Sequence, residues 1–161
     1  MLNLYIRISL EIISYLDVNQ MRRRCPDSSV IGKAALSGYK LVFNRYSEGW
    51  QCGVADILKD PREKVWGLLF NISTGDLNNL DQCEGYPSLY RRIDIEVLDQ
   101  ENVLRRAISY EVVIKGEFAC PSPEYMNIIR SASKNFDFPN GYIEGIERYL
   151  THAQNSKKQL E

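Results

Sequence analysis

The sequence predicts an α+β fold: a small mixed β-barrel with a short internal helix and C-terminal helices. Two observations lead to this prediction. Several β-rich runs fill the first part of the chain, while helical periodicity is confined to one short internal stretch and to the C-terminal part. Closure of the strands into a barrel is favoured because it removes exposed strand edges.

Composition sets the class of protein. The 161 residues, of which 44% are hydrophobic, fit one domain with an ordinary core, and we expect it over residues 1–152, followed by a polar tail over 153–161. The net charge of −1 gives no bulk attraction to nucleic acid. No apolar run approaches the roughly 20 residues of a membrane span, and the N-terminal stretch lacks the features of a secretory signal. We therefore expect a cytoplasmic protein with neither nucleic-acid nor membrane partners.

The β-rich runs define the expected strands. Residues 2–8 alternate loosely, and further runs occupy residues 39–43, 52–58 and 65–72. Residues 59–63 contain proline and several charges, which predict a turn between the last two runs. Further along the chain, apolar residues alternate with charged ones from residue 91 onward, and a polar turn follows, so that residues 91–114 predict a hairpin.

Cap signals define the helices. Ser73 followed by Asp76 resembles a capping box, and Gly85 can supply a left-handed C-terminal cap, which predicts a helix over residues 74–83. Ser122 followed by Pro123 is a good helix start. A last helix is expected after the proline and glycine that precede residue 142.

The few histidines and cysteines of the chain limit the catalytic and metal sites that it can form. His152 is the one histidine of the chain, so a hydrolytic triad would have to use a residue on the expected terminal helix, and a two-histidine zinc site is excluded. The four cysteines form no Cys-x-x-Cys pair and are expected to be buried free thiols. The basic run Arg22-Arg23-Arg24 could contact phosphate, but adjacent helical residues do not share one face and no aromatic residues are interleaved.

Glu84 is the most distinctive candidate for chemistry, because it follows the predicted helix and precedes several tyrosines. A carboxyl group in an aromatic pocket loses hydration, so its pKa rises toward neutrality and it becomes suited to general acid/base catalysis. The alternative is a solvated carboxylate at a helix end. Tyr90, Tyr110 and Tyr125 present a similar choice between core residues and hydroxyl donors in a pocket.

Several ordered segments between Met21 and Leu150 resemble the gamma-glutamylcyclotransferase family. They are Met21-Arg22-Arg23-Arg24-Cys25-Pro26, Gly38-Tyr39-Lys40-Leu41-Val42-Phe43, Gly53-Val54-Ala55-Asp56-Ile57, Val65-Trp66-Gly67-Leu68-Leu69, Leu80-Asp81-Gln82-Cys83-Glu84-Gly85-Tyr86-Pro87, Tyr90-Arg91-Arg92-Ile93 and Pro121-Ser122-Pro123-Glu124-Tyr125. The resemblance implies a small α+β barrel that cleaves a gamma-glutamyl amide and forms 5-oxoproline without metal or organic cofactor.

The resemblance also implies roles for single residues. Glu84 matches the acid/base of such enzymes, and Tyr125 matches a tyrosine that lines the pocket. Tyr90 and Tyr110 fall where the family places further pocket tyrosines. Family members carry a Tyr-Gly-Ser-Asn loop after the first strand, which offers backbone N–H groups to the glutamyl end of the substrate. The ungapped match here is Ile12-Ile13-Ser14-Tyr15, in which Ser14 alone is kept as a candidate substrate-binding residue.

These observations leave three interpretations. The first is an enzyme that converts a gamma-glutamyl amino acid or amide; a gamma-glutamylamine and glutathione are the other substrates considered. The second is a catalytically inactive member that binds a small metabolite or protein partner, which the altered N-terminal segment favours. A ligand-binding barrel unrelated to the family ranks below both. A shifted reading frame before Asp17 would also explain the altered segment, and another frame across codons 9–16 should then encode glycine.

Overall fold

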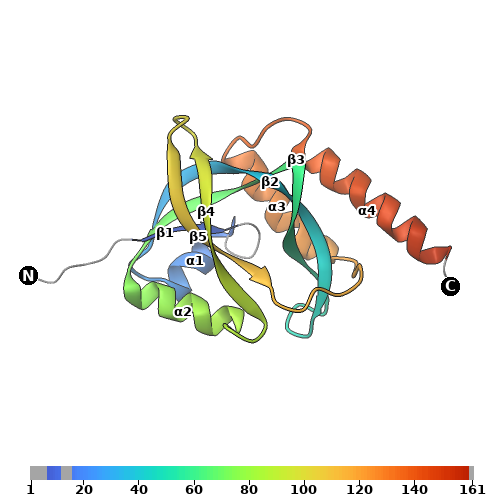
Figure 1. The fold of residues 1–161 in the computed structure, drawn as a ribbon, viewed down its shortest axis with the longest axis horizontal. Coiled ribbons are helices and arrows are strands. Elements are labelled where there is room, and N and C mark those ends of the chain that lie inside the picture. The colour runs from blue at the N-terminus through green and yellow to red at the C-terminus, as the bar shows by residue number, and fades with distance from the viewer. Residues whose placement is uncertain (1–6, 12–15, 160–161) are drawn as a thin grey trace, which may run out of the picture.

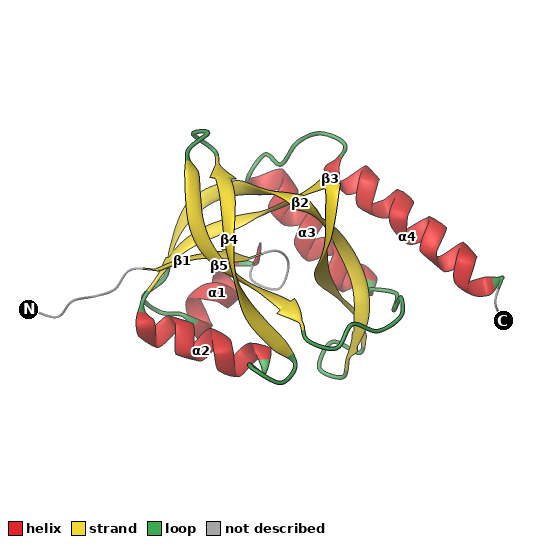
Figure 2. Ribbon diagram, in the orientation of Figure 1, coloured by secondary structure: helices red, strands yellow, loops and turns green. Residues whose placement is uncertain are grey.

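The computed structural model describes residues 7–11 and 16–159. Strand β1 (Arg7–Glu11), helix α1 (Val18–Arg24) and the long strands β2 (Ser29–Ser47) and β3 (Cys52–Ile72) come first. They are followed by α2 (Thr74–Glu84), β4 (Tyr90–Asp99), β5 (Leu104–Val112), α3 (Pro123–Asn135) and α4 (Tyr142–Lys158). Figures 1 and 2 show the strands wrapped around one another, with helices at both sides of them.

The strands form a closed barrel in the order β1-β3-β2-β4-β5. The pairs β1–β3, β2–β3, β2–β4 and β4–β5 are antiparallel, and the barrel is closed by a parallel contact between β1 and β5, at Ser9 and Ile108. The predicted α+β fold with a small mixed barrel is therefore confirmed. The predicted hairpin over residues 91–114 is also confirmed, as β4 and β5.

Strands β2 and β3 are longer than the β-rich runs predict. A turn between two strands is expected over residues 59–63, but β3 runs through them. Tyr39 pairs with Lys59 and Ser37 pairs with Lys64, so Gly38 faces four residues of β3 that lack partners on β2. Pro61 has no N–H to donate to a ladder, which explains this local loss of pairing without an end to the strand.

Helix α2 has the caps that the sequence predicts. The Ser73 side chain accepts from the Asp76 N–H at 3.0 Å, and the Asp76 carboxylate accepts from the Ser73 N–H at 3.2 Å. Gly85 ends the helix in the left-handed region, at φ 66°. The first turn is additionally tied to the chain before β2, because Asp27 accepts from the Ser73 hydroxyl at 2.9 Å. These caps fix where α2 stops and thus where Glu84 lies.

Of the remaining helices, α3 begins where the sequence predicts, α4 is longer than predicted and α1 is not predicted. Helix α1 is not anticipated in the polar, basic stretch that precedes Cys25; Asp17 caps it by accepting from two backbone N–H groups, and Met21 anchors it in the core. Ser122 caps α3 as expected. Helix α4 continues to Lys158, so most of the predicted polar tail is the exposed end of this helix, which projects from the barrel in Figure 1.

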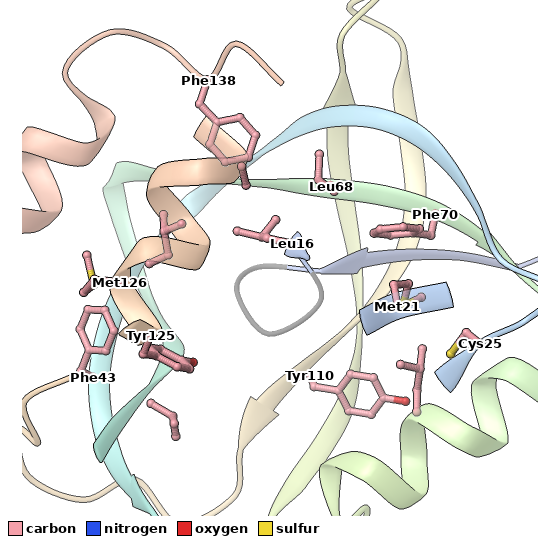
Figure 3. Close-up of a cluster of buried hydrophobic side chains, with 14 of the residues drawn as sticks. Leu16, Met21, Cys25, Phe43, Leu68, Phe70, Tyr110, Tyr125, Met126 and Phe138 are labelled. Atoms are coloured by element: carbon pink, nitrogen blue, oxygen red, sulfur yellow. The ribbon is translucent and has the colours of Figure 1, made fainter. Parts of the chain in front are cut away.

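The core consists of two clusters. The larger one joins the barrel to the helices and includes Met21, Phe43, Phe70, Tyr110 and Tyr125 (Figure 3). The smaller one, built on residues such as Ile57, Val65 and Val97, fills the other part of the barrel. No helix in the described part of the chain is long and apolar enough to cross a membrane.

Candidate active site

A cleft of about 680 Å³ lies where the end of α2, the beginning of β4 and the turn between β2 and β3 meet. Its walls combine aromatic, cationic and carboxylate side chains. The residues that line it are Arg24, Arg45, Tyr46, Ser47, Glu48, Gly49, Trp50, Val54, Cys83, Glu84, Leu89 and Tyr90. Parts of the chain that are distant in sequence therefore contribute to one hollow.

Glu84 is the last residue of α2, and the cap of this helix directs it into the cleft. Gly85 donates its N–H to the carbonyls of the preceding turn, and Tyr86 donates its N–H to the Asp81 carbonyl at 2.9 Å. Among the described residues, none forms an ion pair with Glu84. Loss of hydration raises the pKa of its carboxyl to about 7, although the positive charges of Arg24 and Arg45 oppose the shift.

Asp81, one turn earlier on α2, differs from Glu84 because its carboxylate has both a hydrogen-bond partner and an ion-pair partner. Its carboxylate accepts from the Tyr110 hydroxyl at 2.7 Å and pairs with the Arg92 guanidinium at 3.3 Å. Arg92 in turn lies over the ring of Tyr86, 4.5 Å from its centroid. The end of α2 is thereby tied to both strands of the β4–β5 hairpin, which holds Glu84 in place relative to Tyr90.

Tyr90 is the first residue of β4 and lines the same cleft as Glu84. Burial raises the pKa of its hydroxyl to about 12, and the negative charge of Glu84 adds to this effect. The Arg45 guanidinium lies 5.3 Å from the centroid of the Tyr90 ring. Tyr90 is therefore a neutral hydroxyl, able to donate a hydrogen bond beside a carboxyl group at neutral pH.

Tyr125 lies in the first turn of α3 and is buried, with 1% of its surface exposed. Its hydroxyl accepts from the Ala55 N–H at 3.1 Å. Its ring makes an edge-on contact with Trp50, with 5.1 Å between centroids, and another with Phe43, beside which it is seen in Figure 3. Tyr125 thus supports Trp50, which is itself a wall of the cleft.

The structure brings some of the sequence-predicted site residues together and separates others. Glu84 and Tyr90 line one cleft, whereas Tyr125 lies behind Trp50 and is not among the described residues that line it. The Tyr110 hydroxyl is directed to Asp81 on α2 (Figure 3). Ser14 lies outside the described residues.

Sequence reasoning does not identify Arg45, Trp50 or Cys83 as parts of the site. Arg24 belongs to the basic run of the sequence, and the structure places it at the cleft. Cys83 and Cys120 are exposed, which corrects the expectation that all thiols are buried; Cys83 lies on the cleft because it precedes Glu84 in the last turn of α2. In the part of the chain that the structure describes, no cluster of three or more His, Cys, Asp or Glu side chains could hold a metal ion.

The sequence and the fold of this chain are similar to those of known proteins. The sequence profile of the AIG2-like family matches residues 64–146. The gamma-glutamylcyclotransferases of Homo sapiens and Mus musculus are 32% and 30% identical over 139 residues, which cover 83% of this chain and 73% of each relative. A solved structure named gamma-glutamyl cyclotransferase superposes with a TM-score of 0.81 at 28% identity, covering 88% of this chain and 86% of the other.

The fold and the cleft define a closed-barrel protein of the AIG2-like class, with a carboxyl group at the end of its internal helix. The chain belongs to the AIG2-like, gamma-glutamylcyclotransferase family, because the profile matches more than half of the chain and curated relatives reach 32% identity over most of it. The resemblance found in the sequence is thereby confirmed.

Proposed function

We propose that this protein is an enzyme that converts a gamma-glutamyl amino acid or amide into 5-oxoproline and a free amine, with Glu84 as the general acid/base. The observation that supports this proposal best is the Glu84 carboxyl, which lines a cleft and whose pKa of about 7 lets it accept and release a proton near neutral pH. The family of the chain supports the same reaction class.

The proposed reaction proceeds by intramolecular aminolysis. The Glu84 carboxylate takes a proton from the α-ammonium group of the substrate, and the freed amine attacks the γ-carbonyl carbon. A new carbon–nitrogen bond closes the five-membered ring, and the original amide bond breaks. Glu84 gives this proton to the departing nitrogen as the amide bond breaks. It then takes the second proton that the new ring nitrogen must lose and passes it to the same amine, so that 5-oxoproline and the protonated amine leave and the carboxylate is restored.

This reaction fits the side chains that are present. The substrate carries its own nucleophile, and the effective molarity of a well-oriented intramolecular attack reaches about 10⁵ M or more. The protein therefore needs neither a Ser or Cys nucleophile nor a histidine, and we propose that it acts without metal or organic cofactor. Donors for the developing oxyanion are still required.

The tyrosines take different parts in this proposal. The Tyr90 hydroxyl stays protonated at neutral pH and can donate a hydrogen bond to the substrate beside Glu84. Tyr125 shapes the pocket through Trp50, and Tyr110 acts on the pocket from the other side of α2, through Asp81. Ser14 is proposed to contact the glutamyl end of the substrate. Tyr90 is thus the tyrosine that we expect to touch the reacting groups.

One assay tests the reaction. The purified protein is incubated with gamma-glutamyl-alanine, and 5-oxoproline and free alanine are quantified. We expect both products in equal amounts. A folded protein that releases neither product from gamma-glutamyl-alanine would refute the enzyme proposal for this substrate, and a gamma-glutamylamine and glutathione would then be assayed in the same way.

The second candidate is a catalytically inactive family member that binds a small metabolite or protein partner. The observation that favours it is the segment Ile12-Ile13-Ser14-Tyr15, which lacks the glycine of the family loop. β-Branched residues do not readily adopt the backbone angles that glycine permits. Binding of gamma-glutamyl-alanine without release of alanine would support this candidate over the enzyme.

We also propose that the protein acts in the cytoplasm on a small-molecule substrate. All four cysteines are free thiols, two of them exposed, and such thiols persist in a reducing compartment. Cell fractionation with an antibody to the chain tests this location, and recovery in a secreted fraction would contradict it.

A further inference from the structure

Arg45 is presented to the cleft by an irregularity in strand β2. Phe43 pairs with Ala55 and Arg45 pairs with Val54, so Asn44 is an extra residue that interrupts the ladder. Such bulges re-aim the side chains beside them. The bulge at Asn44 is held in place by strand β3, because the buried Asn44 amide donates to the Asp56 carboxylate at 2.8 Å.

The cluster beneath the bulge is itself rigid. The buried Asp56 carboxylate also accepts from the Val112 N–H at 2.9 Å and from the Lys115 ammonium at 2.6 Å. These bonds join β2, β3 and the end of β5. The backbone that carries Arg45 therefore has a defined position before any ligand binds, which lowers the entropic cost of binding.

The Arg45 guanidinium is placed over the Tyr90 ring, with 5.3 Å to the centroid, and lines the cleft together with Glu84. The positive charge of Arg45 favours the ionised form of the Glu84 carboxyl, but no ion pair joins Arg45 to any carboxylate of the described residues. The Arg45 guanidinium lies over the ring and hydrogen-bonds the Tyr90 side chain, but it has no carboxylate partner among the described residues, so its remaining N–H groups can bind a planar anion.

The position of Arg45 along the chain indicates which end of a substrate it would meet. Strand β2 ends two residues after Arg45, at Ser47, and the turn to β3 follows; exposed Tyr46, Glu48 and Trp50 make the rim of the cleft. The proposed reaction requires the amino group of the glutamyl part to reach Glu84, so the departing part of the substrate extends toward Arg45 and the rim.

From this geometry we infer that Arg45 is a specificity-determining residue that binds the free carboxylate of the departing amino acid. The inference rests on the proposed function and narrows it: gamma-glutamyl amino acids with a free carboxylate are preferred over gamma-glutamyl amides and amines. A substrate with a neutral departing end loses the charged hydrogen bonds, and one with a cationic end is repelled by Arg45.

The test compares two substrates that differ in one group, gamma-glutamyl-alanine and gamma-glutamyl-alaninamide. We expect Arg45→Met to lower kcat/KM for gamma-glutamyl-alanine about 10- to 100-fold, the range for loss of charged hydrogen bonds. The amide should change less than about 3-fold, because its neutral end gains little from the guanidinium. Arg45→Lys should lie between wild type and Arg45→Met, because it keeps the charge and loses the planar fork. Arg23→Met, an exposed arginine of α1 that does not line the cleft, is the matched control.

Binding measurements separate this inference from the proposed reaction. In the Glu84→Gln background, which should not turn over, calorimetry with the same two compounds should show the same selective loss when Arg45→Met is added. If wild type turns over neither compound but this selective loss persists, the reaction fails and the assignment of Arg45 stands. Equal losses for both compounds, or no loss for gamma-glutamyl-alanine, would overturn the assignment.

Discussion

The last turn of α2 has two sides that carry the same functional group in opposite surroundings. On the side of the hairpin, Asp81 accepts a hydrogen bond from Tyr110 and pairs with Arg92. On the side of the cleft, Glu84 forms no ion pair with the described residues, and loss of hydration raises its pKa to about 7. One carboxylate fixes the helix end, and the other is available for proton transfer.

The difference shows how a single short motif can serve both structure and chemistry. A carboxylate that is hydrogen-bonded to a tyrosine and paired with an arginine of neighbouring strands anchors the helix end. A desolvated carboxyl exchanges its proton near neutral pH, provided that its position is fixed by something else. Asp81 supplies that fixed position for Glu84, so the two residues are expected to respond to mutation in different ways.

The largest expected effect is on turnover. Glu84→Gln keeps the volume of the side chain and removes the basic oxygen, so kcat for gamma-glutamyl-alanine should fall by about 10²- to 10⁴-fold. The measurement is 5-oxoproline formation, with circular dichroism to verify the fold. Activity within a few-fold of wild type would remove Glu84 from the mechanism.

The dependence of kcat/KM on pH in the wild-type enzyme should show the raised pKa of the Glu84 carboxyl. The carboxylate form is the base, and it is lost as the pH falls below about 7, so kcat/KM should decrease about tenfold per pH unit between pH 6 and 5. Initial rates with gamma-glutamyl-alanine across this interval provide the test. A rate that stays constant down to about 4.5, the value for an unperturbed glutamate, would contradict the desolvated carboxyl.

On the hairpin side, Asp81→Asn should affect stability more than chemistry. The substitution removes the charge that binds Arg92 and weakens the acceptor for Tyr110, which should lower the free energy of unfolding by about 1–2 kcal/mol. Urea denaturation measures this change, and kcat should fall less than tenfold. A loss of turnover equal to that of Glu84→Gln, at unchanged stability, would reverse the roles of the two carboxylates.

The smallest expected effect is a gain in stability for Glu84→Gln. Because the pKa is raised on folding, the folded state keeps a proton that the unfolded state releases, so wild type loses stability as the pH rises from about 4.5 to about 7 and no further above it. Glutamine carries no charge to desolvate. The variant should therefore be more stable than wild type by on the order of 1–2 kcal/mol at pH 8, after allowance for partial exposure of Glu84, and about equal to it at pH 4.5.

Denaturation curves at both pH values decide this last prediction. The control is Glu101→Gln, which changes an exposed carboxyl in the β4–β5 turn and should leave the difference between the two pH values as in wild type. A Glu84→Gln variant that is less stable than wild type at pH 8 would mean that the carboxylate is stabilised, not desolvated, in the cleft.

The sequence predicted most features that depend on neighbouring residues. The capping box of Ser73 and Asp76, the glycine that ends α2 and the start of α3 at Ser122 were confirmed, because each involves hydrogen bonds between residues a few positions apart. Glu84 could be singled out by its place in a short segment that resembles a family motif. Helix α1 was missed because its cap, Asp17, stands before a stretch with few apolar residues.

What the sequence alone determined is thus most of the elements, the caps of α2 and the start of α3, and the carboxyl group that ends α2. Tertiary structure decided the surroundings of that group: Arg45 and Tyr90 come from separate strands, and no local pattern places them beside Glu84. It also decided that Tyr110 is bound to Asp81. The physical reason is that caps and turns depend on short-range hydrogen bonds, whereas loss of hydration and the pairing of charges depend on which distant segments pack together.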